Sequence, residues 1–206
     1  MQTNKKISGF QKQKIGFLSR KDKSIKGSID GKIKKLVGCI NSLKDYYTTS
    51  SCSGRIILLA TTEPRKKNLC EIEFCSHRKV NLKGINKEMD NLIRIKKIKQ
   101  DVWIKAEPAI LHISSETVES AIKLLNAARD SGFKRSGIIG VRRDKVSVEI
   151  AGTERLEAII IKKGELIIGD LYLSHLIKES NLKLEITHKK IIQLANNLKP
   201  WILKVI

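Results

Sequence analysis

The most informative stretch of the sequence reads Tyr46-Tyr47-Thr48-Thr49-Ser50-Ser51-Cys52-Ser53-Gly54-Arg55, and it runs directly into the apolar segment Ile56–Ala60. Five aliphatic hydroxyls, a thiol and a guanidinium therefore precede a strand rich in β-branched residues. Backbone amides at a strand end have no ladder partner, and small donors placed there can hold anions or polar ligands. The stretch predicts a binding site at a strand end.

Helical periodicity appears in four places around this stretch. Apolar residues at helical spacing predict a helix over 29–42 with Ser28 as its N-cap, and the clearest helix over 118–128. The C-terminal region predicts one helix over 170–180 and a second from 187 until Pro200 halts or bends it.

Strand periodicity fills most of the remaining chain. Segment 89–100 is ambiguous, although the partial alternation of 94–99 suits a strand with one charged face. Segments 102–106 and 109–114 read as one strand interrupted by Pro108, because proline cannot donate to a ladder. A loop is expected at 62–68. Further strands are expected over 55–60, 69–76, 136–142, 145–151, 156–161 and 165–167.

This pattern predicts an α+β fold. Six or more strands with about four helices, joined by hairpins, favour a single compact domain over 1–206 built on a mixed, largely antiparallel sheet. A basic lead over 1–27 and a helical segment over 170–206 flank it. A Rossmann fold is disfavoured, because no glycine-rich loop joins a first strand to a helix.

Charge indicates the partner. The 206 residues include 41 Lys and Arg against 21 Asp and Glu, a net charge of +20, with a basic excess near the N-terminus. Such a bias attracts nucleic acid, although a solvated lysine-rich surface remains the alternative. No apolar run is long enough for a membrane span and no secretory leader is evident, so we expect a cytoplasmic protein away from membranes.

The four cysteines are expected to be free thiols. Their spacing matches no disulfide ladder, and a zinc site on Cys70, Cys75 and His77 would lack a fourth ligand. No metal is therefore expected.

Several segments together give the chain a resemblance to a known family, that of the third protein of tRNA wybutosine synthesis. The similarity covers roughly 18–184, and it is strongest over 47–56. One departure is Ile72, where the family usually has tryptophan. The other matching segments are 26–30, 104–112, 130–138 and 152–157.

The resemblance implies an enzyme and a set of site residues. It implies a methyltransferase that uses S-adenosylmethionine to methylate the N-4 ring nitrogen of the tricyclic wybutosine precursor at position 37 of phenylalanine tRNA. His77 or His112 would accept the departing proton, since an ordinary histidine pKa of about 6.5 suits that work. The cofactor would be bound by Ser51, Ser53, Gly54, Arg55 and Glu107. The tRNA anticodon loop would be contacted by Arg20, Lys21, Lys23, Lys26, Tyr47 and Lys105.

Each assignment has a structural alternative. Arg55 would also suit a surface ion pair. The serines would suit turn or capping roles, and His112 would suit a half-buried structural position. Without the resemblance, the residues support a non-enzymatic basic RNA-binding module. A hydrolase using Ser51 or Cys52 is disfavoured, because no G-x-S-x-G motif is present.

Overall fold

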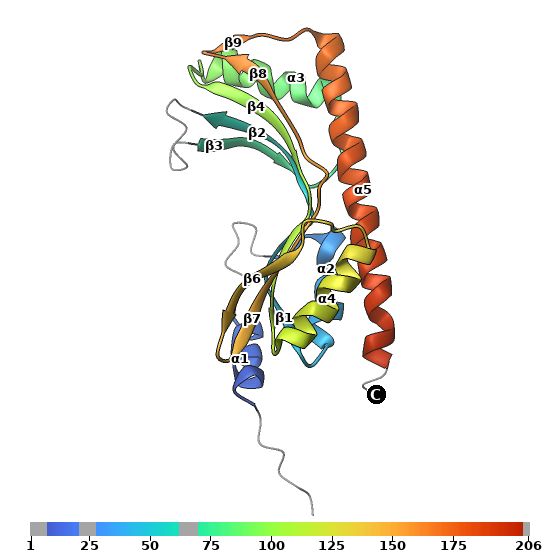
Figure 1. Cartoon of the computed structure of the whole chain (residues 1–206). Coiled ribbons are helices and arrows are strands. Elements are labelled where there is room, and N and C mark those ends of the chain that lie inside the picture. The colour runs from blue at the N-terminus through green and yellow to red at the C-terminus, as the bar shows by residue number, and fades with distance from the viewer. Residues whose placement is uncertain (1–7, 21–27, 62–69, 204–206) are drawn as a thin grey trace, which may run out of the picture. The chain divides into compact units, whose positions relative to one another are not determined.

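The computed structural model describes residues 8–20, 28–61 and 70–203, which form two compact units (Figure 1). Each unit has its own antiparallel sheet and its own aliphatic core. The α+β class and the antiparallel pairing are therefore confirmed, and the strands are divided between two sheets. The single domain over 1–206 stays a prediction. Unit 1 takes its residues from Met1–Ser53, Ala109–Thr153 and His188–Ile206, and unit 2 from Gly54–Pro108 and Glu154–Thr187.

The unit 1 sheet has the strand order β1-β5-β7-β6. Its strands alternate cleanly: in β5, Leu111 and Ile113 are buried while His112 between them faces the other side. The β6–β7 hairpin turns at Arg143-Asp144, as predicted. The strand bounds are Tyr46–Cys52 for β1, Ile110–Ser115 for β5, Gly137–Arg142 for β6 and Lys145–Ala151 for β7.

Three of the helices lie wholly in unit 1. Helices α2 (Gly31–Ser42) and α4 (Val118–Asp130) bury their apolar stripes in the unit 1 core. The N-cap of α2 is Asp30 rather than the predicted Ser28, and no side-chain bond caps the helix. Helix α1 (Gly9–Leu18) lies within the predicted basic lead and packs against β1.

The unit 2 sheet has the strand order β3-β2-β4-β8-β9. Its core is formed by aliphatic residues that alternate along the strands, among them the fully buried Ile56, Leu58 and Ile104. Every strand had been expected, and the predicted loop at 62–68 lies outside the described residues. The strand bounds are Arg55–Thr61 for β2, Cys70–Ser76 for β3, Asp101–Glu107 for β4, Leu156–Lys162 for β8 and Glu165–Leu166 for β9.

The structure resolves one ambiguous segment as helical and corrects one strand prediction. Segment 89–100 holds the end of helix α3 (Leu82–Asp90) and a π-helical turn (Asn91–Ile95), because Ile85, Met89 and Leu92 recur at helical spacing and are buried. The strand expected to continue across Pro108 is instead two strands, β4 and β5, in different sheets. Likewise the polar stretch before Arg55 is itself a strand, β1.

The two predicted C-terminal helices are one helix, α5 (Asp170–Leu203). No glycine or proline lies between 180 and 187 to end the first helix, and Pro200 is accommodated near the C-terminal end. The early part of α5 packs Leu173 and Ile177 into the unit 2 core, and its later part packs Leu194 and Leu198 into the unit 1 core. Among the described residues, no helix is both long and apolar enough to span a membrane.

Candidate active site

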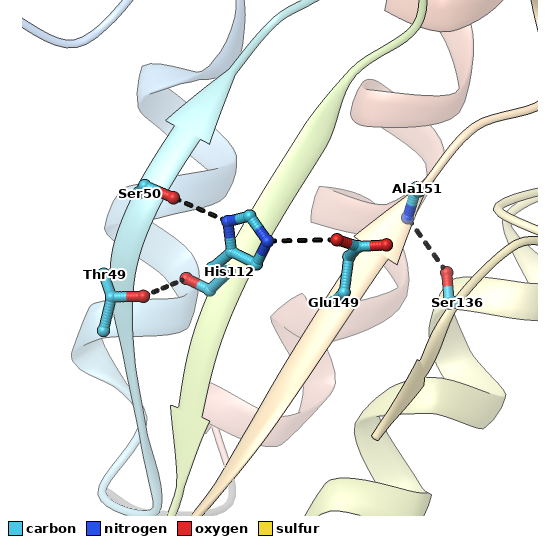
Figure 2. Close-up of polar contacts among 6 residues, drawn as sticks. All are labelled: Thr49, Ser50, His112, Ser136, Glu149 and Ala151. Atoms are coloured by element: carbon cyan, nitrogen blue, oxygen red, sulfur yellow. Dashed lines mark hydrogen bonds and ion pairs between the residues drawn. The ribbon is translucent and has the colours of Figure 1, made fainter. Parts of the chain in front are cut away.

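The open face of the unit 1 sheet carries a row of polar side chains across three strands (Figure 2). Ser50 of β1 pairs opposite His112 of β5, which in turn pairs opposite Glu149 of β7. Ser50 Oγ lies 2.8 Å from His112 Nδ1, and His112 Nε2 lies 3.0 Å from Glu149 Oε2. The side chains of His112 and Glu149 are 36% and 34% exposed. The row is therefore a hydrogen-bonded chain within reach of a ligand.

The carboxylate fixes the tautomer of the imidazole. An ionised Glu149 can only accept, so the neutral His112 ring donates its proton from Nε2. The other nitrogen, Nδ1, then carries the lone pair and accepts the hydroxyl proton of Ser50. The row can accordingly take up a proton at the Ser50 end, and Glu149 stabilises the imidazolium that results.

A β-bulge brings Ser50 into this row. Thr48 pairs opposite Ile113 and Ser50 pairs opposite His112, so Thr49 is an extra residue in β1. Thr49 Oγ1 donates to the backbone oxygen of His112 at 3.1 Å, which holds the bulge in place (Figure 2). Because side chains alternate across a strand, a bulge of one residue changes which residue shares the face of His112. The predicted Ser51 instead pairs opposite Leu111.

Ser53 is fully buried, and its backbone N and its Oγ both donate to Asp30 Oδ2 at 3.2 Å. Asp30 is the N-cap residue of α2, so the carboxylate ties the end of β1 to the start of that helix. The geometry gives Ser53 a structural bond where a cofactor contact was predicted.

In unit 2, Arg55 and Glu107 form a cross-strand ion pair. They pair opposite each other on β2 and β4, with Arg55 Nε 2.6 Å from Glu107 Oε2. Their side chains are 32% and 39% exposed. Two residues predicted to bind cofactor are thus brought together as one accessible pair of opposite charges.

His77 follows β3 and also lies in unit 2. Its Nδ1 lies 2.8 Å from the carbonyl oxygen of Gly54, so Nδ1 carries the proton and donates. Gly54 has a φ of +88°, a left-handed conformation that glycine adopts without steric cost. The predicted residues Gly54 and His77 are therefore in direct contact.

Lys105 and Tyr47, both predicted to bind substrate, have partners within their own units. Lys105 Nζ lies 2.7 Å from Glu157 Oε1, and its side chain is 20% exposed. Tyr47 is buried, with its ring centroid 5.3 Å from that of Phe10 and 5.5 Å from that of Phe17 in α1. Because these rings cover Tyr47, we give it a packing role and do not retain it as a stacking platform.

Ile72, which stands where the family usually has tryptophan, shares a cross-strand row with Trp103. Ile72 of β3 is 47% exposed and pairs opposite Leu59 of β2, which pairs in turn opposite Trp103 of β4. A tryptophan therefore lies in the same cross-strand row as Ile72, two strands away.

The predicted tRNA contacts in the basic lead are only partly visible. Arg20 follows α1, is exposed, and its guanidinium lies 5.8 Å from the centroid of the Phe17 ring. Lys21, Lys23 and Lys26 lie outside the described residues. Within α1, Lys14 is buried and donates to the carbonyl of Leu43, and burial lowers the pKa of this lysine. That contact helps to hold α1 on unit 1.

A family model described as methyltransferase TYW3 matches residues 5–200 of the chain. The chain belongs to the TYW3 family of methyltransferases. The resemblance noted in the sequence is therefore confirmed, and a methyltransferase replaces both the non-enzymatic RNA-binding module and the hydrolase. Membership of this family implies a methyl donor.

Relatives of the TYW3 chain come from archaea and animals. A Thermococcus sibiricus protein named tRNA(Phe) 7-((3-amino-3-carboxypropyl)-4-demethylwyosine(37)-N(4))-methyltransferase is 35% identical over 194 residues, which are 92% of this chain and 93% of that protein. The human tRNA wybutosine-synthesizing protein 3 homolog is 34% identical over 92% of this chain and 72% of its own length. The solved PH1069 protein of Pyrococcus horikoshii OT3 has a TM-score of 0.79 at 29% identity, over 94% of this chain and 95% of that one.

Sequence reasoning missed two residues of the row in this TYW3 chain, Ser50 and Glu149. Ser50 was within the polar stretch, but the sequence does not reveal the bulge that places it, rather than Thr49, opposite His112. Glu149 alternates with the buried Val148 and Ile150, which places it on the open face of β7. That alternation was the signal that could have identified Glu149. It does not single Glu149 out, because many exposed carboxylates alternate with buried residues in the same way.

Proposed function

We propose that this chain transfers a methyl group from S-adenosylmethionine to the N-4 ring nitrogen of the 4-demethylwyosine base at position 37 of tRNA(Phe), the reaction named for its archaeal relatives. Family membership supports the reaction class, and the Ser50–His112–Glu149 row supports the way in which the chain handles the acceptor proton. The net charge of +20 suits a tRNA substrate.

The Arg55–Glu107 pair fits the amino-acid end of the methyl donor. That end is a zwitterion, with a carboxylate that suits the guanidinium and an ammonium that suits Glu107. Both side chains are about one-third exposed, so a ligand can reach them. When bound, S-adenosylmethionine supplies an electrophilic methyl carbon, whose bond to sulfur breaks with its electrons passing to sulfur.

The row on the unit 1 sheet acts on the acceptor proton. The hydroxyl of Ser50 takes the proton from the acceptor nitrogen while its own proton passes to His112 Nδ1 over the existing 2.8 Å contact. Glu149, already bonded to Nε2, stabilises the imidazolium. The row thus orients the acceptor and removes its proton. We choose His112 as the base, because Glu149 already bonds its Nε2 and compensates the developing charge.

The proposal is tested with tRNA(Phe) that carries 4-demethylwyosine at position 37. The chain is incubated with S-adenosylmethionine bearing a labelled methyl group, and the modified nucleoside is located by mass spectrometry. We expect the label on N-4 of the tricyclic base, and none on matched tRNA already methylated there. Labelling at another nucleotide, or none when both substrates bind, would contradict the proposal.

A further inference from the structure

A hollow of about 930 Å³ lies at the far end of the unit 2 sheet from Arg55 and Glu107. Strands β2 and β4 are antiparallel, so Thr61 pairs opposite Asp101 at the hollow. The rest of the lining comes from β3, from the segment 96–100 and from the turn between β8 and β9, which Figure 1 shows beside β4. Five of its lining residues are lysines and three are carboxylates. They are Lys96, Lys97, Lys99, Lys162 and Lys163, with Glu71, Glu73 and Asp101.

Two of the three carboxylates are committed to holding the wall together. Glu73 pairs with Lys96 at 2.6 Å, and its side chain is 8% exposed. Asp101 pairs with Lys162 Nζ at 3.0 Å and accepts the backbone N–H of Lys163 at 3.0 Å.

The other three lysines, Lys97, Lys99 and Lys163, are exposed. They form no ion pair with any residue among 8–20, 28–61 and 70–203. Three ammonium groups are thus available in one hollow.

The backbone holds two of these lysines in an uncommon conformation. Lys97 and Lys163 both have a φ of 49°, and within the described ranges they are the non-glycine residues with positive φ. Positive φ is uncommon for a non-glycine residue, and at Lys163 it belongs to the two-residue turn between β8 and β9. Both outliers line the same hollow.

The two lysine-bearing loops are also packed against each other. A Cβ on Gly164, which follows Lys163, would lie 2.4 Å from the backbone oxygen of Ile98. Ile98 is only 8% exposed and joins the unit 2 core, so it anchors the loop between Lys97 and Lys99. The ammonium groups are therefore presented by a fixed scaffold.

We propose that this lysine hollow binds the sugar–phosphate backbone of the tRNA substrate, at the opposite end of the unit 2 sheet from the Arg55–Glu107 pair. This inference rests on the proposed function. Lysine offers a compact positive charge without the planar fork of arginine, and among the described residues that line the hollow there is neither an arginine nor an aromatic ring that would read a base. The contact would therefore position the tRNA without specifying its sequence.

The distance along β2 between the Arg55 end and the hollow suits a ligand longer than one nucleotide. Thr61 is the sixth residue after Arg55 along β2, and six steps of 3.3 Å correspond to about 20 Å. Phosphates repeat every few ångströms along a nucleic-acid strand, so about 20 Å spans several nucleotides of a stem. A stem can thus reach the hollow from a contact at the Arg55 end.

The test compares two variants that lose the same charge in the same unit. The first combines Lys97→Gln, Lys99→Gln and Lys163→Gln, and the control combines Lys83→Gln, Lys87→Gln and Lys178→Gln on the exposed surfaces of α3 and α5. Affinity for tRNA(Phe) is measured by fluorescence anisotropy across a salt series. S-adenosylmethionine affinity and melting temperature report on folding.

We expect the hollow variant to bind tRNA at least about tenfold more weakly at 0.1 M salt, with a salt slope shallower by about one to two units. The control should stay within about twofold of the wild type, with cofactor affinity unchanged in both variants. Equal binding by the two triple variants would overturn this inference while leaving the proposed function intact. Failure of the wild type to bind tRNA(Phe) at all would instead count against the proposed function.

A competition experiment distinguishes RNA from small anions. Inorganic phosphate should displace tRNA only at millimolar concentration, as a screening ion does. Lysine-dependent binding of inorganic phosphate at micromolar concentration would overturn the inference, because it would identify a small-anion site.

Discussion

The two sheets share a construction but differ in what their open faces present. In unit 1 the face carries an imidazole between a hydroxyl and a carboxylate, at 2.8 and 3.0 Å. In unit 2 the face carries two ion pairs across neighbouring strands, Arg55–Glu107 and Lys105–Glu157. The first arrangement changes its charge when it accepts a proton, and the second keeps fixed charges. Under the proposed function, proton handling and charge recognition are therefore assigned to different sheets.

The largest expected effect follows from replacing the titratable group of unit 1. His112→Asn keeps a polar side chain but removes the base, and we expect kcat for methyl transfer to fall by about 100-fold or more. S-adenosylmethionine affinity, measured by calorimetry, should be unchanged because the fixed charges are intact. His175→Asn, on the exposed surface of α5, is the matched control and should behave as wild type. A kcat within a few fold of wild type for His112→Asn would contradict the role of His112 as the base.

A stability measurement sharpens the contrast between buried and exposed polar contacts. Asp30→Ala leaves the fully buried Ser53 without its acceptor, and we expect the free energy of unfolding to fall by about 2 kcal/mol. Asp90→Ala removes an exposed carboxylate paired with Arg94 at 3.5 Å in unit 2, and should cost less than about 0.5 kcal/mol. Urea titration of both variants provides the comparison. Equal losses would show that the Asp30 contact contributes no more than a surface pair.

The fixed charges of unit 2 are tested by cofactor binding. Arg55→Ala should weaken S-adenosylmethionine binding by more than about tenfold, since a charge-assisted pair contributes about 1.5 to 3 kcal/mol. Lys79→Ala removes a cation from an exposed pair with Glu185 in the same unit and should leave the affinity unchanged. Calorimetric titration compares the two. If Arg55→Ala binds as tightly as Lys79→Ala, the Arg55–Glu107 pair is only structural.

The smallest effect concerns the group that orients the imidazole. Glu149→Gln keeps a hydrogen-bonding partner for His112 but loses the charge, and we expect kcat to fall by about tenfold. Glu119→Gln, at an exposed position of α4, is the control. If both variants retain full activity, Glu149 has no orienting role.

The sequence predicted the fold class because its local signals agree. Alternating residues such as Val146, Val148 and Ile150 marked β7, and the helical spacing of Leu36, Val37 and Ile40 marked α2. The division into two sheets was not visible in the sequence, because the interruption at Pro108 reads as a bend in one strand. The continuity of α5 was missed because two apolar stripes serve two different cores.

The site was predicted in part, and the limit is geometric. Periodicity and resemblance identified His112, Arg55 and Glu107, which the structure places on open sheet faces. The bulge at Thr49 decides that Ser50 rather than Thr49 pairs opposite His112, and it depends on pairing between distant strands. Sequence reasoning also could not pair Arg55 with Glu107, 52 residues apart, before the register of β2 and β4 was known.

The most direct test of the central claim, that His112 and Glu149 act as one proton-accepting unit, is a double-mutant cycle on the chemical step. The rate of methyl transfer to 4-demethylwyosine tRNA is measured in single turnover for His112→Asn, Glu149→Gln and the double variant. The account predicts that the double variant is within about twofold of His112→Asn alone, because an orienting carboxylate has no effect once its base is gone. Full multiplication of the two single effects would show that the residues act independently and would contradict the account.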